Sequence, residues 1–337
     1  MTPARFKKIT DAYANLRIGI AGDFCLDRYL EIDPARKEAS IETGLPVHNV
    51  VRVRAQPGGA GTVLNNLVAL GIGRIIPLGI TGEDGEGYEL RRALAGMRGV
   101  EASHFITTPD RQTFTYCKPL ILGPGAAPME LNRLDQKNWT PTPKHISARI
   151  SDSLLTIAGE VDALILLSQV DKPETGVLTA DVLETAKRIA KAHPRLMILA
   201  DSRSGFAGFP PIIFKMNESE LCKNTNATLL ENLAQILSSA TSLAKRNGQL
   251  VFVTMAERGI LGAAPDGTTE HVPALAIRGP IDIVGAGDAV TANLTAALAS
   301  GASMREALEL ANAAASIVIH QLGTTGVATV EELGNYT

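Results

Sequence analysis

The segment DIVGAGDAVTANLTAALASG, residues 282–301, places three small residues and a carboxylate directly before an apolar helical pattern. Gly285, Ala286 and Gly287 let a ligand approach the backbone closely, and the apolar periodicity predicts that a helix begins at Asp288. The first amides of a helix have no partner within the helix, and the helix dipole places positive charge behind them. The pattern therefore predicts a site that binds an anion such as a phosphoryl group.

Asp288 stands at the mouth of this predicted anion site, where its carboxylate can take the proton of an attacking hydroxyl. General-base catalysis of this kind contributes roughly 10² to 10⁴ in rate. During phosphoryl transfer, negative charge spreads over the equatorial oxygens, so unpaired amides stabilise the transition state. A purely structural interpretation is also open, in which Asp288 caps a helix and the glycines form a tight turn.

Two more carboxylates follow the first apolar run, in GIAGDFCLDRYL. Asp23 and Asp27 come just after the carboxyl end of a predicted strand, where open parallel sheets bind ligands. Both are candidates for binding substrate hydroxyls, although Asp27 could instead form a salt bridge within a lid. The pair Gly58 and Gly59 in QPGGAGTVLNNLVALG fits a close approach to a ligand, or a glycine-rich helix start without one.

Short apolar runs alternate with amphipathic helical stretches along the chain, which is typical of parallel strands covered by helices on both faces. The sequence therefore predicts an α/β fold. The last helix, residues 303–322, should begin with a capping box from Ser303 to Glu306 and stop at Gly323. The other predicted elements are strands at residues 16–22, 74–80, 161–168, 195–201 and 250–255, and helices at residues 60–71, 84–97, 144–159, 178–192 and 228–246.

Residues 28–55 and 103–135 break this rhythm, because polar and apolar residues alternate there as in extended hairpins. We expect these segments to form a small antiparallel lid on a single domain that spans residues 1–337. The alternative is a pair of long surface loops, which are uncommon at this length. Within the second hairpin, GPGAAP at residues 123–128 is expected to form a mobile turn.

The composition argues against several classes of function. A balance of 32 Lys and Arg against 35 Asp and Glu gives a net charge of -3, so the basic surface that nucleic acid needs is missing. Cys25, Cys117 and Cys222 form neither a metal-binding pair nor an even disulfide set. No apolar run approaches the length of a membrane span, so we expect no membrane partner and a cytoplasmic location.

The run DIVGAGD resembles the C-terminal signature D-T-x-G-A-G-D of the ribokinase-like, or phosphofructokinase-B, carbohydrate kinases, with Ile283 in place of threonine. QPGGAGTVLNN resembles their N-terminal signature, in which Thr62 replaces an asparagine and shortens or loses one sugar contact. The resemblance covers residues 16–333. It implies a three-layer αβα sandwich with a mainly parallel central sheet and a small β lid. It also implies ATP-dependent phosphorylation of a sugar hydroxyl, with Asp288 as the base.

The same resemblance implies a nucleotide site in the second half of the chain. Asn217 and Glu220 match the family's N-x-x-E element, in which the glutamate holds Mg²⁺ through water, or they form a helix cap with an exposed acid. Asn312 matches a position that lines the adenine pocket, or it is a satisfied polar residue of the core. The remaining implied residues are Thr254, Glu257 and Gly259 at a nucleotide turn, and Asp282 and Val284 at a K⁺ site found in some relatives.

Three segments resemble, more specifically, the kinase half of bifunctional heptose-phosphate kinase and adenylyltransferases: GDFCLD at 22–27, ELNRLD at 130–135 and ANAAASIVIHQLGTTGV at 311–327. They imply a heptose 7-phosphate acceptor and a homodimer, without the adenylyltransferase activity. The chain departs from that pattern at Gln169, where an acid is expected, and at Arg203, where a lysine is expected. Arg133 and Arg203 are candidates for holding a substrate phosphate, or they are solvated surface charges.

Other classes fit the sequence less well. It has no complete G-x-G-x-x-G at a strand-to-helix turn, as a Rossmann oxidoreductase needs, and no G-x-x-x-x-G-K-[ST] of a P-loop. A sugar or nucleotide sensor without catalysis is the main alternative, because Thr62, Gln169 and Arg203 depart from the family's acceptor site. A nucleoside kinase also stays open. The intact GAG turn with Asp288 favours an active enzyme.

Overall fold

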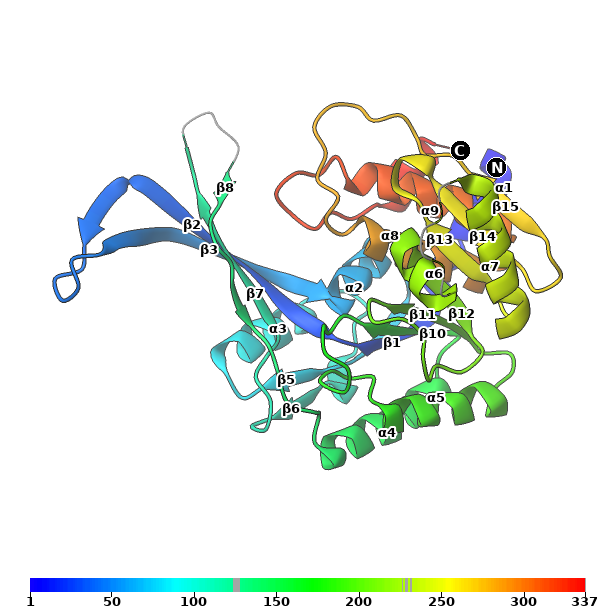
Figure 1. The fold of residues 1–337 in the computed structure, drawn as a ribbon, viewed down its shortest axis with the longest axis horizontal. Helices are drawn as coiled ribbons and strands as arrows, with labels where there is room; N and C mark the ends of the chain where they lie inside the picture. The colour runs from blue at the N-terminus through cyan, green and yellow to red at the C-terminus, as the bar shows by residue number, and fades with distance from the viewer. Residues whose placement is uncertain (124–127, 226, 228–229, 231, 337) are drawn as a thin grey trace.

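The central layer is an eight-stranded sheet in the order β15-β14-β13-β12-β11-β10-β1-β4 (Figure 1). The structure is a computed structural model that describes residues 1–337 except 124–127, 226, 228–229, 231 and 337. The strands from β4 to β13 run parallel, and β14 and β15 are antiparallel. Their bounds are β1 Arg17–Gly22, β4 Arg74–Leu78, β10 Ala163–Ser168, β11 Met197–Ser202, β12 Ile213–Asn217, β13 Val251–Thr254, β14 Ile260–Ala263 and β15 Thr269–Val272.

Helices cover both faces of this sheet, so an inner strand such as β10 is buried along its whole length. In β10, Ile165 and Leu167 belong to one core cluster, whereas Leu164 and Leu166 belong to the other. One cluster includes residues of α1 Pro3–Thr10, α2 Ala60–Ala69, α3 Gly85–Ala95, α8 Ala286–Ala299, α9 Met304–Val318 and α10 Val330–Gly334. The other includes residues of α4 Lys144–Ala158, α5 Ala180–Ala192, α6 Glu218–Thr225 and α7 Leu233–Asn247.

This arrangement confirms the predicted three-layer αβα sandwich, and every predicted strand and helix is present with shifted ends. Strands β12, β14 and β15 were missed, because each is only four or five residues long and β12 carries a lysine at its centre. The helix expected from residue 228 begins, within the described residues, at Leu233. In the part of the chain that the structure describes, no helix has both the length and the apolar character to cross a bilayer.

A second sheet, in the order β3-β2-β7-β8 with β9 beside β7, extends from the body at the left of Figure 1. It is rooted where β1 ends, because β2 begins directly after Asp23 and β3 ends directly before α2. We call this sheet the lid. Its strands are β2 Phe24–Ala39, β3 Pro46–Gly59, β7 Thr115–Ile121, β8 Met129–Glu130 and β9 Leu134–Gln136.

The lid differs from its prediction in pairing and in extent. β2 pairs antiparallel with β3 but parallel with β7, so the expectation of a purely antiparallel lid is wrong. Its second segment begins at β7 rather than at residue 103, since β6 (Ile106–Thr108) pairs with β5 (Ile80–Gly82) outside the lid. The turn expected at residues 123–128 lies largely outside the described residues.

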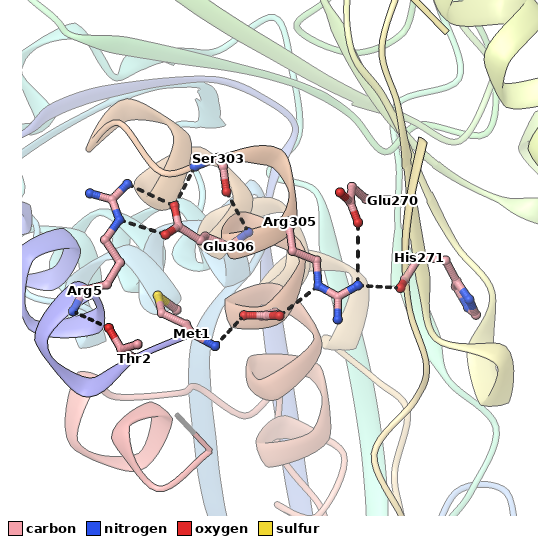
Figure 2. A network of polar contacts seen from close by, with 9 residues as sticks. Met1, Thr2, Arg5, Glu270, His271, Ser303, Arg305 and Glu306 are labelled. Atoms are coloured by element: carbon pink, nitrogen blue, oxygen red, sulfur yellow. Dashed lines mark hydrogen bonds and ion pairs between the residues drawn. The ribbon is translucent and has the colours of Figure 1, made fainter. Parts of the chain in front are cut away.

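A polar network fixes α1 against the start of α9 (Figure 2). The predicted capping box is confirmed, with Ser303 and Glu306 each bonding the backbone of the other. Arg5 Nε donates to Glu306 Oε1 at 2.8 Å, and the amino group of Met1 donates to Glu309 Oε2 at 3.0 Å. Arg305 links the same helix to the backbone oxygen of His271 in β15. The network anchors the helix that carries Asn312.

α9 ends earlier and α8 begins earlier than the sequence predicted. α9 ends at Val318 rather than at residue 322, because the His320 amide donates to the Ile317 carbonyl in a tightened last turn. α8 begins at Ala286 rather than at Asp288, with Gly285 as its N-cap residue at a φ of 86°. Asp288 therefore lies in the first turn of α8 and is not the cap.

Candidate active site

The start of α8 carries amides without partners, at the carboxyl edge of the sheet. The Ala286 amide donates to the Ile283 carbonyl at 3.3 Å, and the Ala289 amide donates to Gly285 at 2.9 Å. Among the described residues, the amides of Gly285, Gly287 and Asp288 have no acceptor. The sequence predicted free amides at Gly285, Ala286 and Gly287, whereas the structure has the Ala286 amide bonded and the Asp288 amide free in its place. Together with the helix dipole, these amides favour an anion at this position.

Asp288 is half-buried, and charged groups from several elements surround its carboxyl. Burial, and then repulsion by Asp201, raise the pKa of Asp288 to about 7, and the carboxylate of Asp27 acts in the same direction. Lys215 and Arg203 lower it and offset part of this shift. A carboxyl with this pKa exchanges a proton near neutral pH, which suits a general base.

A buried ion pair beneath this site was missed from the sequence. Lys215, on β12, donates from Nζ to Asp201 Oδ2 at 2.8 Å, and the Thr291 hydroxyl of α8 donates to the same oxygen at 2.8 Å. Burial by itself lowers the pKa of Lys215, but Asp201, Asp288 and Glu220 raise it above its ordinary value. A Cβ atom at Gly287 would lie 3.1 Å from Lys215 Nζ, so this position brings the ammonium close to the helix start.

The signal for Lys215 was present in the sequence, as a charged residue inside the apolar run IIFKM just before Asn217. The Asn217 and Glu220 pair itself forms a reciprocal helix cap. Glu220 N–H donates to Asn217 Oδ1 at 2.9 Å, and Asn217 N–H donates to Glu220 Oε2 at 2.8 Å. Glu220 is nevertheless buried rather than exposed, and burial raises its pKa. No described residue donates a hydrogen bond to its second oxygen, Oε1, which is therefore available to another ligand.

Asp23 and Asp27 both lie at the root of the lid, but their surroundings differ. Asp23 accepts the Val177 amide at Oδ1 (2.7 Å) and the Gln169 amide at Oδ2 (2.8 Å), so its carboxylate fastens the loop between β10 and α5 to the end of β1 at two points. Asp27 accepts no hydrogen bond from the described residues, and the Lys118 ammonium lies 3.9 Å away. Asp27 is therefore the better placed of the two to accept a substrate hydroxyl.

The other residues predicted on the acceptor side have structural reasons for their identity. A Cβ at Gly58 would lie 2.6 Å from Asp27 Oδ2, and one at Gly59 would lie 2.5 Å from the Asp23 carbonyl oxygen. Thr62 is buried, and its methyl carbon lies 3.5 Å from the Cβ position of Gly285, so it packs beneath the start of α8.

Cations of the lid lie over two tyrosines near Asp27, and Arg203 follows directly after the end of β11. Arg133 Cζ lies 4.9 Å from the centre of the Tyr116 ring, and Lys118 Nζ lies 5.0 Å from that of Tyr29. Arg133 also pairs with Asp135 at 2.8 Å. Arg203 is exposed, and no ion pair joins it to an acid in the part of the chain that the structure describes. Its charge lowers the pKa values of Asp27 and Asp288.

A cavity of about 630 Å³ opens on the other side of the α8 start. Thr254, Glu257 and Gly259 line it from the end of β13, and Asn217 lines it from β12. Asn312 lines it from α9 while its amide nitrogen donates to the Pro273 carbonyl at 2.9 Å, so this residue also fastens the loop that follows β15.

Asp282 and Val284 lie in the loop that leads into α8. The Asp282 amide donates to the Ile319 carbonyl at 2.8 Å, and Asp282 Oδ1 accepts the Val284 amide at 3.0 Å. The loop is thereby tied to the end of α9. A K⁺ ion at this position stays a prediction.

The arrangement places a nucleotide-sized cavity, an anion site, a poised carboxyl and a second carboxylate in sequence along one sheet edge. The family model described as "pfkB family carbohydrate kinase" matches residues 24–330. This chain belongs to the pfkB family of carbohydrate kinases. The expectation of an enzyme that phosphorylates carbohydrates is thereby confirmed.

The relatives of this pfkB family kinase include bifunctional proteins that are longer than the chain. The bifunctional protein HldE of Pelobacter propionicus is 31% identical over 318 residues, which cover 93% of this chain and 61% of that protein. HldE of Paramagnetospirillum magneticum is 33% identical over 317 residues, with the same two coverages of 93% and 61%. The chain thus spans about three fifths of the length of these relatives.

Solved structures share the fold of this pfkB family kinase at low sequence identity. The ribokinase of Arabidopsis thaliana, complexed with ribose and ATP, has a TM-score of 0.69 at 19% identity, covering 95% of this chain and 98% of that one. Phosphofructokinase-2 from Escherichia coli, in complex with fructose-6-phosphate, has a TM-score of 0.70 at 16% identity, with coverages of 95% and 98%. These similarities confirm the ribokinase-like fold.

Proposed function

We propose that this kinase transfers the γ-phosphoryl group of ATP to a hydroxyl of a sugar phosphate, with a heptose 7-phosphate as the favoured acceptor. The observation that carries the proposal is the position of Asp288. Its carboxyl, with a pKa of about 7, stands beside three amides without partners at the start of α8. The resemblance to heptose-phosphate kinases supports the choice of acceptor.

In the proposed reaction, the acceptor hydroxyl oxygen attacks the γ-phosphorus while its proton passes to the Asp288 carboxylate. A new O–P bond forms as the bond between the γ-phosphorus and the bridging oxygen of ADP breaks. The free amides of Gly285, Gly287 and Asp288 neutralise the charge that develops on the phosphoryl oxygens. Lys215 supplies a positive charge from below, and its bond to Asp201 holds it in place.

The residues present fit a nucleotide with its magnesium ion. A cavity of about 630 Å³ lies in the range typical of small-molecule sites. Glu220 has one carboxylate oxygen that no described residue bonds, and a carboxylate beside phosphates is a usual partner for Mg²⁺ and its waters. When bound, Mg²⁺ would be held near Glu220 and would neutralise phosphate charge.

On the acceptor side, we assign Asp27 to the sugar hydroxyls and Arg203 to the substrate phosphate, with Arg133 beside it. Arg203 is exposed, it lies near Tyr116, and no ion pair joins it to an acid among the described residues, so its guanidinium can make a bidentate contact with phosphate. Arg133 is held by Asp135 and Tyr116 and is less free to rearrange.

ADP release and calorimetric binding across acceptors test the proposal. The panel contains heptose 7-phosphate, fructose 6-phosphate, ribose and a nucleoside. We expect turnover with a phosphorylated sugar, and a rise in its KM in Arg203→Ala that an unphosphorylated sugar does not show. Binding of a sugar without turnover on any acceptor would instead indicate a sensor, and turnover of the nucleoside alone would indicate a nucleoside kinase.

We further propose a homodimer that forms through the outer half of the lid. Large apolar side chains are exposed there, among them Ile41 (100%), Leu45 (64%) and Val51 (44%). Apolar side chains gathered on a projecting sheet are typical of a surface that a partner covers. In a two-fold symmetric dimer, the exposed apolar residues of one lid would pack against the same residues of the other lid.

A further inference from the structure

Gln56 lies at the root of the lid, opposite the carboxylate that we assign to the acceptor. In the register of β2 and β3, Asp27 faces Gln56. Gln56 is half-buried, and it lies three residues before Gly59, where β3 ends and α2 begins. Its side chain thus occupies the border between the lid and the main domain.

Both ends of the Gln56 side-chain amide bind the loop that follows α9. Gln56 Nε2 donates to Thr325 Oγ1, and Gln56 Oε1 accepts the hydroxyl of Thr324 at 3.2 Å. Among the described residues, Gln56 is the only one of β2 and β3 whose side chain bonds residues 319–328. The two contacts fix both the position and the orientation of the amide.

The same loop packs against the start of α8. The Thr325 Cβ atom lies 3.4 Å from the position that a Cβ of Gly285 would occupy. Asn66 of α2 also binds this loop, at the Gly326 carbonyl and the Ala328 amide, each at 3.4 Å. Gly285 has a free amide at the anion site, so a displacement of Thr325 would displace this amide as well.

We propose that Gln56 is a positioning residue that couples the lid to the anion site at the start of α8. A movement of β3 that accompanies acceptor binding is transmitted through Gln56 to Thr325 and then to Gly285. Coupling of binding free energies is reciprocal, so a nucleotide bound at the anion site must also stabilise the lid. Gln56 touches neither reacting atom in this scheme and acts through the loop.

Hydrogen exchange with the non-hydrolysable analogue Mg·AMP-PNP tests this coupling without any acceptor. In the wild type, the analogue should slow exchange both at residues 284–290 and at residues 46–59 of the lid. In Gln56→Leu, which keeps the size but removes the amide, protection should remain at 284–290 and disappear at 46–59. Asn49→Ala is the matched control, because the Asn49 amide bonds only Arg36 within the same hairpin.

Equal protection of residues 46–59 in Gln56→Leu, or none in the wild type, would refute the coupling. Should Gln56→Leu fail to fold, Thr325→Val removes the same contact from the other partner and must give the same loss.

A second readout rests on the proposed function. Saturating heptose 7-phosphate should tighten AMP-PNP binding by roughly 5-fold or more in the wild type and by about 1-fold in Gln56→Leu. A wild type that does not bind heptose 7-phosphate would contradict the acceptor assignment, while the exchange experiment would still decide the role of Gln56.

Discussion

At the scale of single residues, the site depends on one carboxyl and one ammonium group that the fold brings together. Asp288 comes from the first turn of α8, and Lys215 comes from the middle of β12. The Asp201 carboxylate acts on both groups: it accepts a hydrogen bond from Lys215, and its negative charge raises the pKa of Asp288. In the proposed reaction, this arrangement keeps Asp288 ready to take a proton and places a positive charge near the transferred phosphoryl group.

Asp288→Asn should bind ATP nearly as well as the wild type and lose roughly 10² to 10⁴ of its turnover, because the amide cannot accept the proton. Calorimetry with AMP-PNP and steady-state kinetics measure the two quantities. The control is Asp266→Asn, an exposed acid in the turn between β14 and β15. Wild-type turnover in Asp288→Asn would show that another group is the base.

The pH dependence follows from the raised pKa of Asp288. The carboxyl must be ionised to act, so kcat/KM should be level above the pKa of about 7 and fall about tenfold per pH unit below it. Lys215→Met removes a cation that lowers this pKa, and the acidic limb should therefore move to higher pH. The control is Lys245→Met, which changes an exposed lysine. If the acidic limb of the kcat/KM profile lies at the same pH in both variants, Lys215 does not influence the group that titrates.

At the scale of elements, Gly259 shows how a turn sets the shape of the cavity that we propose for the nucleotide. Its φ is 90°, and a Cβ there would lie 2.0 Å from the Val272 carbonyl oxygen. Gly267, in the next turn, has a similar φ of 95°, but its nearest neighbour would be Lys245 Cε at 3.6 Å. A substitution at Gly267 therefore tests backbone strain alone, whereas one at Gly259 tests strain together with a steric clash.

Gly259→Ala should lower the free energy of unfolding by more than the roughly 1–3 kcal/mol of a strained backbone, and it should weaken ATP binding. Gly267→Ala should show the strain alone and leave ATP binding unchanged. Urea unfolding and calorimetry measure both effects. Equal losses in the two variants would mean that the chain relieves the clash with Val272.

The contact between α1 and α9 also makes a prediction at this scale. The bond from Arg5 is the main reason that the pKa of Glu306 falls from 4.5 to about 2 (Figure 2). A carboxyl whose pKa is lower in the folded chain than in the unfolded chain stabilises the fold at pH values above its unfolded pKa. This stabilisation is lost as the pH falls from about 4.5 towards 2. Urea unfolding should therefore show Glu306→Gln to be less stable than the wild type at pH 6, with a smaller difference near pH 2.

The control for this experiment is Glu331→Gln, which changes an exposed acid in the first turn of α10. A constant difference between wild type and Glu306→Gln at all pH values would mean that packing, and not charge, holds α1 to α9.

At the scale of the whole molecule, the lid extends beyond the body of the enzyme (Figure 1). Its inner half carries Asp27 and Gln56, and its outer half carries the exposed apolar residues. If a second copy covers the outer half, the dimer interface and the proposed acceptor site both include β2 and β3.

Val51→Lys should convert the proposed dimer to a monomer, because it places a charge among the exposed apolar side chains of the lid. Light scattering coupled to gel filtration measures the mass. Leu155→Lys is the control, since Leu155 is 39% exposed on α4, outside the lid. A dimer that persists in Val51→Lys and dissociates in Leu155→Lys would place the interface on α4.

The sequence by itself determined the parts of this protein that depend on neighbours along the chain. Apolar periodicity sets strands and helices within ten to twenty residues, so the α/β layers were predictable. The GAG turn and Asp288 form a helix start within four residues, and the capping box of Ser303 spans four more. Such local patterns can be recognised from the sequence because all the residues that form them lie within one short segment.

Only the tertiary structure decided what depends on which strands become neighbours. β12 lies beside β11, and this adjacency alone brings Lys215 to Asp201. The loop between β10 and α5, more than 140 positions away, occupies both oxygens of Asp23. Asp27 has only the Lys118 ammonium at 3.9 Å and accepts no hydrogen bond from the described residues. Gln56 meets Thr325 across 269 positions of the chain. A side chain's partners at such separations depend on the packing of the whole sheet, which no short window of sequence contains.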